Sequence, residues 1–343
     1  MILFQSDYQE AADVKVLQAL QTADALQMPG YGDDTLTTQT KQQIRTLCDA
    51  PDAEVHFFVG GTQINLTVIA AALRPMEGVI CSDVGHINVH EAGAIEATGH
   101  KVLTLPSTNG KITARQIQAA FDAHMNDVTH EHMVRPGMIY LSHPTELGTL
   151  YSRTELDAIH AVAKACGLRL YIDGARLAYG LAADSTVNLP YLASICDAFT
   201  IGGTKCGALF GEALVLNHAD HWPYFRYCIK QRGALLAKGW LLALQYRVLM
   251  TDNYYTTLGE QANRMAQQIK RAFLDKGYDM LCDTAANQIF PVLTNAALAV
   301  LERNFTFAFW EATDVEHTAV RICVSVTTPQ ENVTELLHAV QAL

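Results

Sequence analysis

Short apolar runs alternate with amphipathic stretches through the first two-thirds of the chain. The run at residues 55–59 leads into Gly60-Gly61-Thr62, and an amphipathic stretch follows from about residue 63 to 73. Further apolar runs lie at 79–81, 102–105, 138–141, 168–172, 199–201 and 213–216. Runs of this length predict buried strands, and apolar residues three or four positions apart predict helices. The alternation predicts an α/β fold in which helices cover both faces of a mostly parallel sheet.

Polar residues mark where two of these helices begin. Thr113 with Gln116, and Ser152 with Glu155, have the spacing of a capping box, in which each residue satisfies a free amide of the other. Gly167 is placed to end the second helix before the next strand.

The pattern changes after about residue 216. Helical sequence dominates from 225 to 276, and the tail then alternates between strand-like and helical stretches. Strands are predicted at 289–293, 306–309 and 320–326, with a helix at 296–303 and a last helix opened by Thr328-Pro329-Gln330-Glu331. That opening combines an N-cap residue, a proline at the first helical position and a capping-box glutamate. We expect a smaller α+β domain after a long connecting helix.

The composition indicates a large core and excludes some partners. Half of the 343 residues are hydrophobic and 17% are charged, which suits one large or two moderate domains. The formal net charge is −11 and no long basic run occurs, which argues against nucleic acid as a partner. No apolar run approaches about 18 residues, so we expect no transmembrane helix.

The first residues and the cysteines indicate a cytoplasmic protein. Residues 1–7 lack the basic and apolar regions of a signal peptide. The eight cysteines are scattered singly, and none forms a C-x-x-C pair. Most lie in apolar patterns, so we expect reduced, buried thiols.

Lys205 and Asp173 point to a cofactor. Each follows a short apolar run that leads into small residues, and Asp173 precedes Lys205 by 32 positions (205 − 173). Ligands in parallel sheets bind beyond the carboxyl ends of the strands. A pyridoxal phosphate (PLP) enzyme needs a lysine for the Schiff base and a carboxylate that keeps the pyridine nitrogen protonated. Either residue alone is more often a surface lysine or a capping aspartate, but the pair predicts a PLP site.

Further residues fall at the same edge of the predicted sheet. Gly60-Gly61-Thr62 lies between a strand and a helix, where backbone amides face a phosphate. His86 follows the next strand, where an imidazole can stack on a flat cofactor. Arg176 and Arg321 are suited to a substrate carboxylate. Each has a plainer explanation as a turn, a core histidine or an ordinary ion pair, and their convergence favours an active site.

The order of these residues resembles that of the threonine aldolase family. These are fold-type-I PLP enzymes that are grouped with β-eliminating lyases. The resemblance spans nearly the whole chain and rests on Ser6-Asp7, Gly61-Thr62, His86 with Glu91, Asp173-Gly174-Ala175-Arg176, Lys205 and Arg321. The Asp-Gly-Ala-Arg sequence, followed about thirty residues later by the lysine, is fairly specific to this group.

The resemblance implies a role for each position. Lys205 forms a covalent Schiff base with PLP, Asp173 pairs with the pyridine nitrogen, and His86 stacks on the ring. Cofactor contacts are implied at Gly60, Gly61, Thr62, His86, Asp173, Arg176 and Lys205. Substrate-carboxylate contacts are implied at Ser6, Arg176 and Arg321. Lys238, with Arg232 as the alternative, is the basic residue that reaches the phosphate of a neighbouring subunit. No metal ion is implied.

The resemblance also implies an architecture and an assembly. The PLP-dependent transferase fold of type I has a large domain with a mostly parallel seven-stranded sheet and a smaller C-terminal α+β domain. We expect residues 1–28, with a helix at residues 13–28, to pack with the small domain. Residues 29–250 then form the large domain, and residues 251–343 the small one. The family forms dimers or tetramers with shared active sites, so a homo-oligomer, such as a homotetramer, is expected, without nucleic acid or membrane partners.

The segment at residues 141–148 departs from the family pattern. Thr145 stands where many members have a histidine that assists at the β-hydroxyl of the substrate, and His143 lies two residues earlier. The base therefore remains open between His86, His143 and an ordered water, because a base must lie within hydrogen-bond reach of its proton.

The implied activity is retro-aldol cleavage of β-hydroxy-α-amino acids to glycine and an aldehyde. Expected substrates are L-threonine, L-allo-threonine and phenylserine-like compounds. β-Elimination, racemisation and transamination on the same scaffold use the same Lys205 and Asp173 and remain alternatives. A non-catalytic α/β binding module, with Gly60-Gly61-Thr62 as an anion site, predicts no effect of Lys205 on ligand binding. No G-x-G-x-x-G motif opens an early βα unit, which disfavours a Rossmann dehydrogenase.

Overall fold

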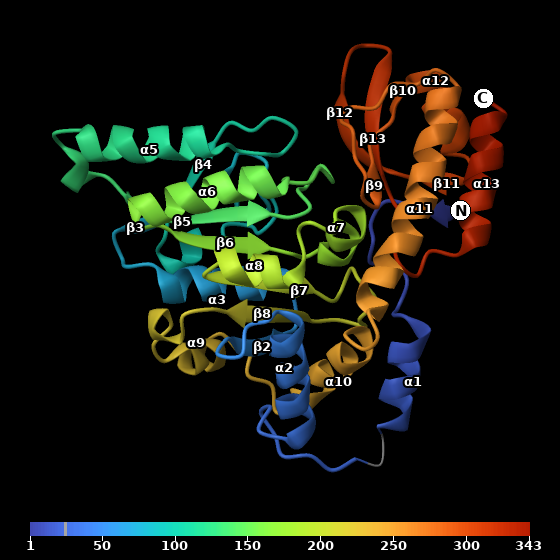
Figure 1. The fold of residues 1–343 in the computed structure, drawn as a ribbon. Helices are drawn as coiled ribbons and strands as arrows, with labels where there is room; N and C mark the ends of the chain where they lie inside the picture. The colour runs from blue at the N-terminus through green and yellow to red at the C-terminus, as the bar shows by residue number, and fades with distance from the viewer. Residues whose placement is uncertain (24–25) are drawn as a thin grey trace.

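A seven-stranded sheet forms the centre of the molecule (Figure 1). The computed structural model describes residues 1–23 and 26–343. The strand order is β2-β8-β7-β6-β5-β3-β4. The strands span Glu54–Phe58 (β2), Glu77–Ser82 (β3), Val102–Leu105 (β4), Arg135–Ser142 (β5), Arg169–Asp173 (β6), Ala198–Gly202 (β7) and Glu212–Leu216 (β8). β8 is antiparallel to both neighbours, and β3 to β7 pair in parallel. The predicted α/β fold with a mostly parallel sheet is confirmed.

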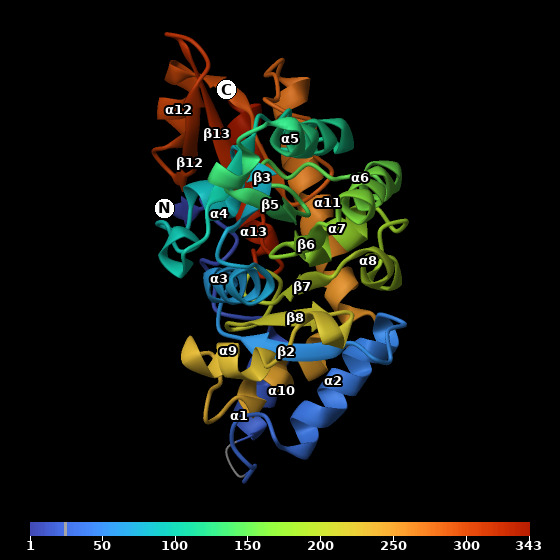
Figure 2. The same cartoon turned by 90° about the vertical axis from the view of Figure 1, so that its left-hand side faces the viewer.

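Helices cover the sheet on both faces (Figure 2). α3 (Gly61–Ala72) and α9 (Phe225–Gln231) lie on one side, and α6 (Arg153–Cys166), α7 (Leu177–Ala183) and α8 (Leu189–Ile195) lie on the other. Side chains alternate across a strand, so neighbouring residues of β3 enter different layers. Val79 packs in the cluster that contains Ile64 of α3, and Ile80 packs in the cluster that contains Ile159 of α6.

The predicted helix caps are present in both expected places. Thr113 caps α5 (Ala114–Asn126) and Ser152 caps α6, and each forms the complete capping box with the residue three positions on. Gly167 ends α6 in the left-handed conformation with φ 64°, which is favourable for a residue without a Cβ.

Two other predicted helix ends are wrong. The last helix, α13 (Gln330–Gln341), has Pro329 at its N-cap and no side-chain cap, because the Thr328 hydroxyl instead accepts from the Ser325 amide at 2.8 Å. The early helix, α1 (Val14–Thr22), ends well before residue 28. Residues 24–25 of that predicted helix lie outside the described residues, and 26–28 are not helical. Pro29 follows directly and disfavours helical backbone at the residue before it.

A second group of strands lies at the C-terminal end of the chain. β10 (Val292–Thr294), β13 (His317–Cys323) and β12 (Ala308–Ala312) pair antiparallel in that order, and β9 (Gln288–Ile289) also pairs with β13. The long helix α11 (Tyr254–Asp275) runs from α10 (Trp240–Leu249) toward these strands (Figure 1). The first strand of the chain, β1 (Ile2–Leu3), pairs in parallel with β11 (Phe305–Thr306). The predicted domain boundaries stay a prediction.

The remaining elements are short or lie at the edges. They are α2 (Thr35–Leu47), which packs against α10, α4 (His86–Val89), α12 (Asn295–Leu301) and the 3₁₀ turns at Glu96–Thr98, His130–His132 and Ala219–His221. Among the described residues, no helix combines the length and the apolar character needed to cross a membrane.

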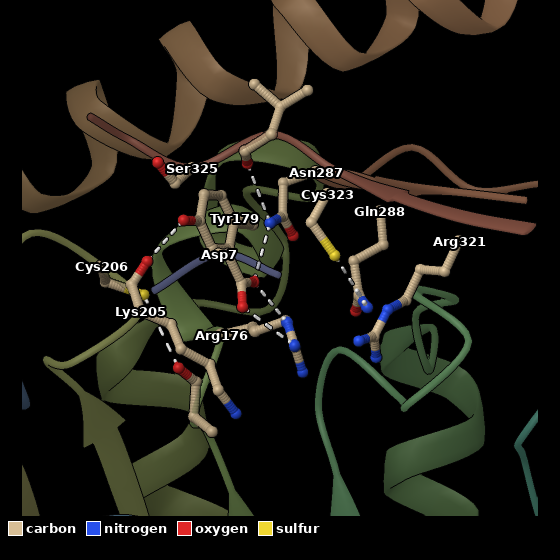
Figure 3. A network of polar contacts seen from close by, with 12 residues as sticks. Asp7, Arg176, Tyr179, Lys205, Cys206, Asn287, Gln288, Arg321, Cys323 and Ser325 are labelled. Atoms are coloured by element: carbon tan, nitrogen blue, oxygen red, sulfur yellow. Dashed lines mark hydrogen bonds and ion pairs between the residues drawn. The ribbon is translucent and has the colours of Figure 1, made fainter. Parts of the chain in front are cut away.

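The N-terminal segment is tied to the large sheet by a buried ion pair (Figure 3). Arg176 donates to both oxygens of Asp7, at 2.6 and 3.0 Å, and Asn287 donates to the same carboxylate at 3.0 Å. The Asp7 side chain is fully buried and that of Arg176 is 11% exposed. Burial raises the pKa of Asp7, but the Arg176 guanidinium and the Lys205 amine more than offset it, so the pKa lies below its usual value.

His143 is buried directly after β5. Its amide donates to the Asp173 carbonyl at 2.9 Å, and its ring packs next to Gly180 of α7. Neither ring nitrogen has a hydrogen-bond partner among the described residues. Burial lowers the pKa of His143 to about 4, so the ring is neutral in the folded protein near pH 7.

Replacing Asp7 is expected to destabilise the protein strongly. Asp7→Asn leaves the buried Arg176 guanidinium without its counter-charge, which typically costs about 3 kcal/mol or more. Urea unfolding at neutral pH measures the change. The control is Asp33→Asn, which removes an exposed ion pair with Arg226 and is expected to cost less than about 1 kcal/mol. Equal effects of the two substitutions would contradict the importance of the buried pair.

Stability is expected to fall as His143 becomes protonated in the unfolded state. The imidazole takes a proton below about pH 6.5 when unfolded but only below about pH 4 when folded, so the free energy of unfolding declines through this window. The complete loss amounts to roughly 3 kcal/mol. His143→Gln is expected to show a shallower decline between pH 7.5 and 5 in urea titrations. His132→Gln, an exposed control, should keep the wild-type slope, and an unchanged slope in His143→Gln would refute the assignment.

Candidate active site

A cavity of about 590 Å³ opens at the carboxyl ends of the parallel strands. Residues that follow β2, β3, β5, β6 and β7 line it, and Trp310 and Arg321 from the C-terminal strands close one side. Eight residues predicted from the sequence lie on its wall: Gly60, Gly61, Thr62, His86, Asp173, Arg176, Lys205 and Arg321. These residues come together because the strands that they follow end at the same edge of the sheet.

Lys205 presents an unpaired amine to this cavity. Its Nζ atom forms no hydrogen bond or ion pair with a described residue, and its carbonyl accepts from the Tyr179 hydroxyl. Burial lowers the pKa of Lys205, and the nearby Arg176 lowers it further. The preceding Gly203 allows a close approach, because a Cβ there would lie 2.4 Å from the Gly211 carbonyl oxygen. The amine therefore faces the cavity without a partner, and the lowered pKa favours its nucleophilic form more than in a free lysine.

Asp173 is a buried carboxylate that is held by neutral donors. Tyr140 donates to Oδ2 at 2.7 Å, Asn65 donates to the same oxygen at 3.0 Å, and the Ala175 amide donates to Oδ1 at 2.9 Å. Burial raises the pKa of Asp173, but His86, the Tyr140 and Asn65 donors and the Lys205 amine lower it below the usual value. No described lysine or arginine forms an ion pair with it, so the site carries a fixed negative charge that suits a cationic ligand group.

A hydrogen-bond network fixes His86 beside this carboxylate. His86 opens the short helix α4, and its Nδ1 lies 2.7 Å from Oε1 of the buried Glu91. Asn65 of α3 joins the two acids, since its amide group also donates to Glu91 at 2.7 Å, and Tyr171 donates to the Asn65 oxygen at 2.6 Å. Glu91 thus fixes the imidazole ring through Nδ1, and the rest of the ring faces the cavity.

The start of α3 offers free backbone amides. Gly60 is the N-cap and provides no side-chain cap, and a Cβ on Gly60 or Gly61 would meet no described atom within 4 Å. Both glycines line the cavity, so the open space beside them is part of it. Unsatisfied amides and the helix dipole together favour an anion such as a phosphate at this place.

The two arginines are not equivalent. Arg176 uses its Nε and Nη2 groups on Asp7, whereas Arg321 has a buried Nε without a partner among the described residues. Arg321 is otherwise held by the Gln5 carbonyl, to which Nη2 donates at 3.1 Å, and its guanidinium lies 6.0 Å from the Trp310 ring. In Figure 3 the side chains of Lys205 and Arg176 extend in the same direction below the Asp7 contacts, with Arg321 to one side.

Several predicted site residues lie elsewhere. Ser6, His143 and Lys238 do not line the cavity. His143 is enclosed in the core, and Lys238 is exposed on the loop before α10. The Arg232 carbonyl accepts from Gln63 of α3 at 3.1 Å, close to the helix start. The roles given to Lys238 and Arg232 at a neighbouring subunit stay predictions.

Two acidic residues of the cavity were missed by the sequence reasoning. Glu212 accepts from the Gly203 amide at 2.9 Å, and burial raises its pKa to about 7. Glu146 accepts from the Ser142 hydroxyl at 2.6 Å and from the His86 amide at 2.8 Å. A carboxylate at the start of the apolar run 213–216 was a usable signal for Glu212. For Glu146 the signal was weaker, because it lies in an irregular segment.

The arrangement fits pyridoxal phosphate. The unpaired Lys205 amine suits its aldehyde, the Asp173 carboxylate suits a protonated pyridine nitrogen, and the open helix start at Gly61 suits its phosphate. His86 lies on the same wall. Each group of this cofactor therefore has a complementary partner on the cavity wall.

Comparison with known proteins agrees with this interpretation. The beta-eliminating lyase family model matches residues 14–296. The low-specificity L-threonine aldolase of Pseudomonas aeruginosa is 32% identical over 286 residues, which cover 81% of each chain. The enzyme of the same name from another Pseudomonas strain is 30% identical over 345 residues, which cover 99% of this chain and 97% of that one.

Solved structures show the same relationship. Threonine aldolase from Leishmania major superposes with a TM-score of 0.96 at 40% identity, over 100% of this chain and 99% of that one. Histidinol-phosphate aminotransferase from Clostridium acetobutylicum, with a TM-score of 0.73 at 13% identity over 100% of this chain and 98% of that one, shares the fold alone. The family and the fold support pyridoxal phosphate as the cofactor. The chain therefore belongs to the beta-eliminating lyase family, as a homologue of the threonine aldolases.

Proposed function

We propose that this protein is a PLP-dependent aldolase that cleaves β-hydroxy-α-amino acids to glycine and an aldehyde. The observation that carries the proposal is the pair formed by an unpaired, buried Lys205 amine and an Asp173 carboxylate that is held by neutral donors in the same cavity. Homologues named low-specificity L-threonine aldolase indicate L-threonine as a substrate, and the proposal extends to L-allo-threonine and phenylserine.

Four parts of the wall would hold the cofactor. Lys205 supplies the amine for covalent attachment, Asp173 binds the pyridine nitrogen, His86 lies against the ring, and the α3 start at Gly61 binds the phosphate. Bound pyridoxal phosphate supplies the electron sink for the pair released when a bond to Cα breaks. Tyr140 and Asn65 keep Asp173 ionised, and that charge keeps the pyridine nitrogen protonated.

Arg321 is the main anchor for the substrate carboxylate. Its buried Nε has no partner among the described residues, and an unpaired donor at a cavity wall calls for an acceptor in the ligand. Arg176 lines the same wall, and its Nη1 group is not used in the contacts with Asp7. Holding the carboxylate fixes the rotation about the bonds to Cα, and so selects which bond is aligned for cleavage.

The expected assembly extends this proposal. A homodimer or homotetramer with shared active sites, in which Lys238 or Arg232 reaches a neighbouring phosphate, follows the family pattern. The eight free cysteines, seven of them buried, support a cytoplasmic location.

Lys205→Ala is expected to abolish both cofactor attachment and cleavage. Purified wild-type protein with PLP should show a visible absorption band and release acetaldehyde from L-threonine or L-allo-threonine, or benzaldehyde from L-phenylserine, together with glycine. The variant should lose the band and the products, because no amine remains for attachment. A wild-type band without aldehyde from any of the three substrates would move the assignment to β-elimination, racemisation or transamination. No band in the wild type would refute the cofactor site.

Arg321→Gln is expected to weaken substrate binding. Hydrogen bonds to a charged group contribute about 1.5–3 kcal/mol, which corresponds to roughly a ten- to hundredfold rise in KM for L-threonine. Steady-state kinetics measure the change, and Arg303→Gln at an exposed position is the matched control. A KM that stays at the wild-type value in Arg321→Gln would remove Arg321 from the carboxylate site.

A further inference from the structure

The proposed cleavage needs a base at the β-hydroxyl of the substrate. Sequence reasoning left this base open, and the buried ring of His143 lies outside the cavity. Two imidazoles and three carboxylates line the cavity: His86, His90, Glu146, Asp173 and Glu212. A general base must be held in a fixed position and must have a free lone pair that faces the substrate.

Glu146 meets these requirements. Its side chain is buried in the cavity wall, where 8% of the residue is exposed. The His86 amide and the Ser142 hydroxyl both donate to Oε1, at 2.8 and 2.6 Å. Both of these hydrogen bonds use the same oxygen, so Oε2 is left for a ligand. The carboxylate is thus oriented by two rigid elements, the end of β5 and the start of α4.

Three of the other four side chains already have a different role or a different binding partner. Asp173 accepts three hydrogen bonds and provides the charge for the pyridine nitrogen. His86 is fixed through Nδ1 by Glu91 and lies against the cofactor ring. Glu212 is paired in register with Phe58 on one side and Gly202 on the other, and binds the Gly203 amide beneath the lysine loop.

His90 is the remaining competitor. It is exposed, and its ring forms no hydrogen bond with a described residue that would fix its position. Burial lowers its pKa, and the neighbouring basic side chains of His86, Arg321, Lys205 and Arg176 lower it further. A ring without fixed orientation is a poorer base than a carboxylate that is held from two sides.

We propose that Glu146 is the general base that takes the β-hydroxyl proton of the substrate, an inference that rests on the function proposed above. The O–H bond breaks, its proton passes to a Glu146 oxygen, and the O–H electron pair forms the second carbon–oxygen bond of the aldehyde. The Cα–Cβ bond breaks, and its electron pair stays with the glycyl fragment. Cα then takes one proton to give glycine, and Glu146 returns its proton to water.

The local environment supports this role. Burial raises the pKa of Glu146, although the Ser142 hydroxyl and the His86 amide partly lower it again. A carboxylate with a raised pKa binds a proton more strongly and is a better base near neutral pH. The active form is the ionised one, so the cleavage rate is expected to fall as the pH drops through the pKa of Glu146.

Two reactions of the same protein separate this role from a structural one. L-Phenylserine cleavage needs a base at the β-hydroxyl, whereas exchange of the glycine α-proton in D₂O does not. Glu146→Gln is expected to slow benzaldehyde release by about 10²- to 10⁴-fold, the usual contribution of a general base, while glycine exchange stays near the wild-type rate. PLP affinity of the apoprotein, followed by the fluorescence of Trp310 and the other tryptophans, should also be unchanged.

Chemical rescue and two further variants complete the test. In Glu146→Ala, added formate can occupy the space of the lost carboxylate and is expected to restore part of the cleavage rate. Ser142→Ala keeps the carboxylate but removes one donor to it, and is expected to slow cleavage by roughly tenfold, the equivalent of one hydrogen bond. Glu96→Gln makes the same chemical change at an exposed position and should behave as wild type.

Several outcomes would overturn the inference while leaving the proposed function intact. One is a Glu146→Gln protein that cleaves L-phenylserine at the wild-type rate. A second is an equal loss of cleavage and glycine exchange, which indicates a structural effect. A third is loss of cleavage, but not exchange, in His90→Asn, with Glu146→Gln still active. If Glu146→Gln fails to fold, Ser142→Ala decides, and a wild-type cleavage rate in that variant counts against Glu146. A wild-type protein that cleaves no β-hydroxy amino acid would instead refute the proposed function itself.

Discussion

A buried negative charge at the end of β6 must be stabilised without an ion pair to a described lysine or arginine. Asp173 obtains this stabilisation from Tyr140 on β5, from Asn65 on α3 and from its own loop amide. Each donor comes from a different element, so the charge can be tolerated only when β5, β6 and α3 are assembled in the observed order. Asn65 extends the same requirement to Glu91 and so to the position of His86. A buried carboxylate without hydrogen bonds is high in free energy. The need to satisfy Asp173 therefore favours the observed arrangement of β5, β6 and α3.

The second charged cluster joins the two ends of the chain to this edge. Asp7 neutralises Arg176, and Asn287 adds a hydrogen bond from the C-terminal region. This pairing occupies one edge of Arg176, so of the two cavity arginines it is Arg321 that has a buried nitrogen without a partner among the described residues. Arg176 and Arg321 are the same residue type on the same cavity wall, but their roles differ, because Arg176 already has an anionic partner within the protein.

Much of the fold could be read from local patterns. The strands of the large sheet, the capping boxes at Thr113 and Ser152 and the glycine end at Gly167 depend on neighbouring residues alone, and these predictions are confirmed. The single strand predicted at 289–293 is wrong, because the structure divides it into β9 and β10. The cap at Thr328 was wrong because its hydroxyl is used by a turn back to Ser325. The sequence pattern gives a spacing but does not show which of two nearby amides a hydroxyl will meet.

Part of the site could also be predicted from local sequence patterns. Strand ends indicate Lys205, Asp173 and His86, since all parallel strands deliver their ends to one edge. The orientation of single side chains was harder to predict. Ser142 faces the cavity, and side chains alternate along a strand, so the next residue, His143, is turned into the opposite layer. Glu146 is held by the local Ser142 hydroxyl and also by the His86 amide of α4, and this second contact, 60 residues away in the sequence, has no local signal.

The pairing of β1 with β11 has a consequence for how the protein is made. Ile2 and Leu3 are synthesised about 300 residues before their partners Phe305 and Thr306. At ordinary synthesis rates this delay lasts roughly 15 to 60 s. During that time the N-terminal strand has no edge to join, and the cavity lacks the wall that carries Arg321. A ribosome that stops early therefore releases a polypeptide with an unpaired leading strand and an open site, and only chains that extend beyond β13 can close both.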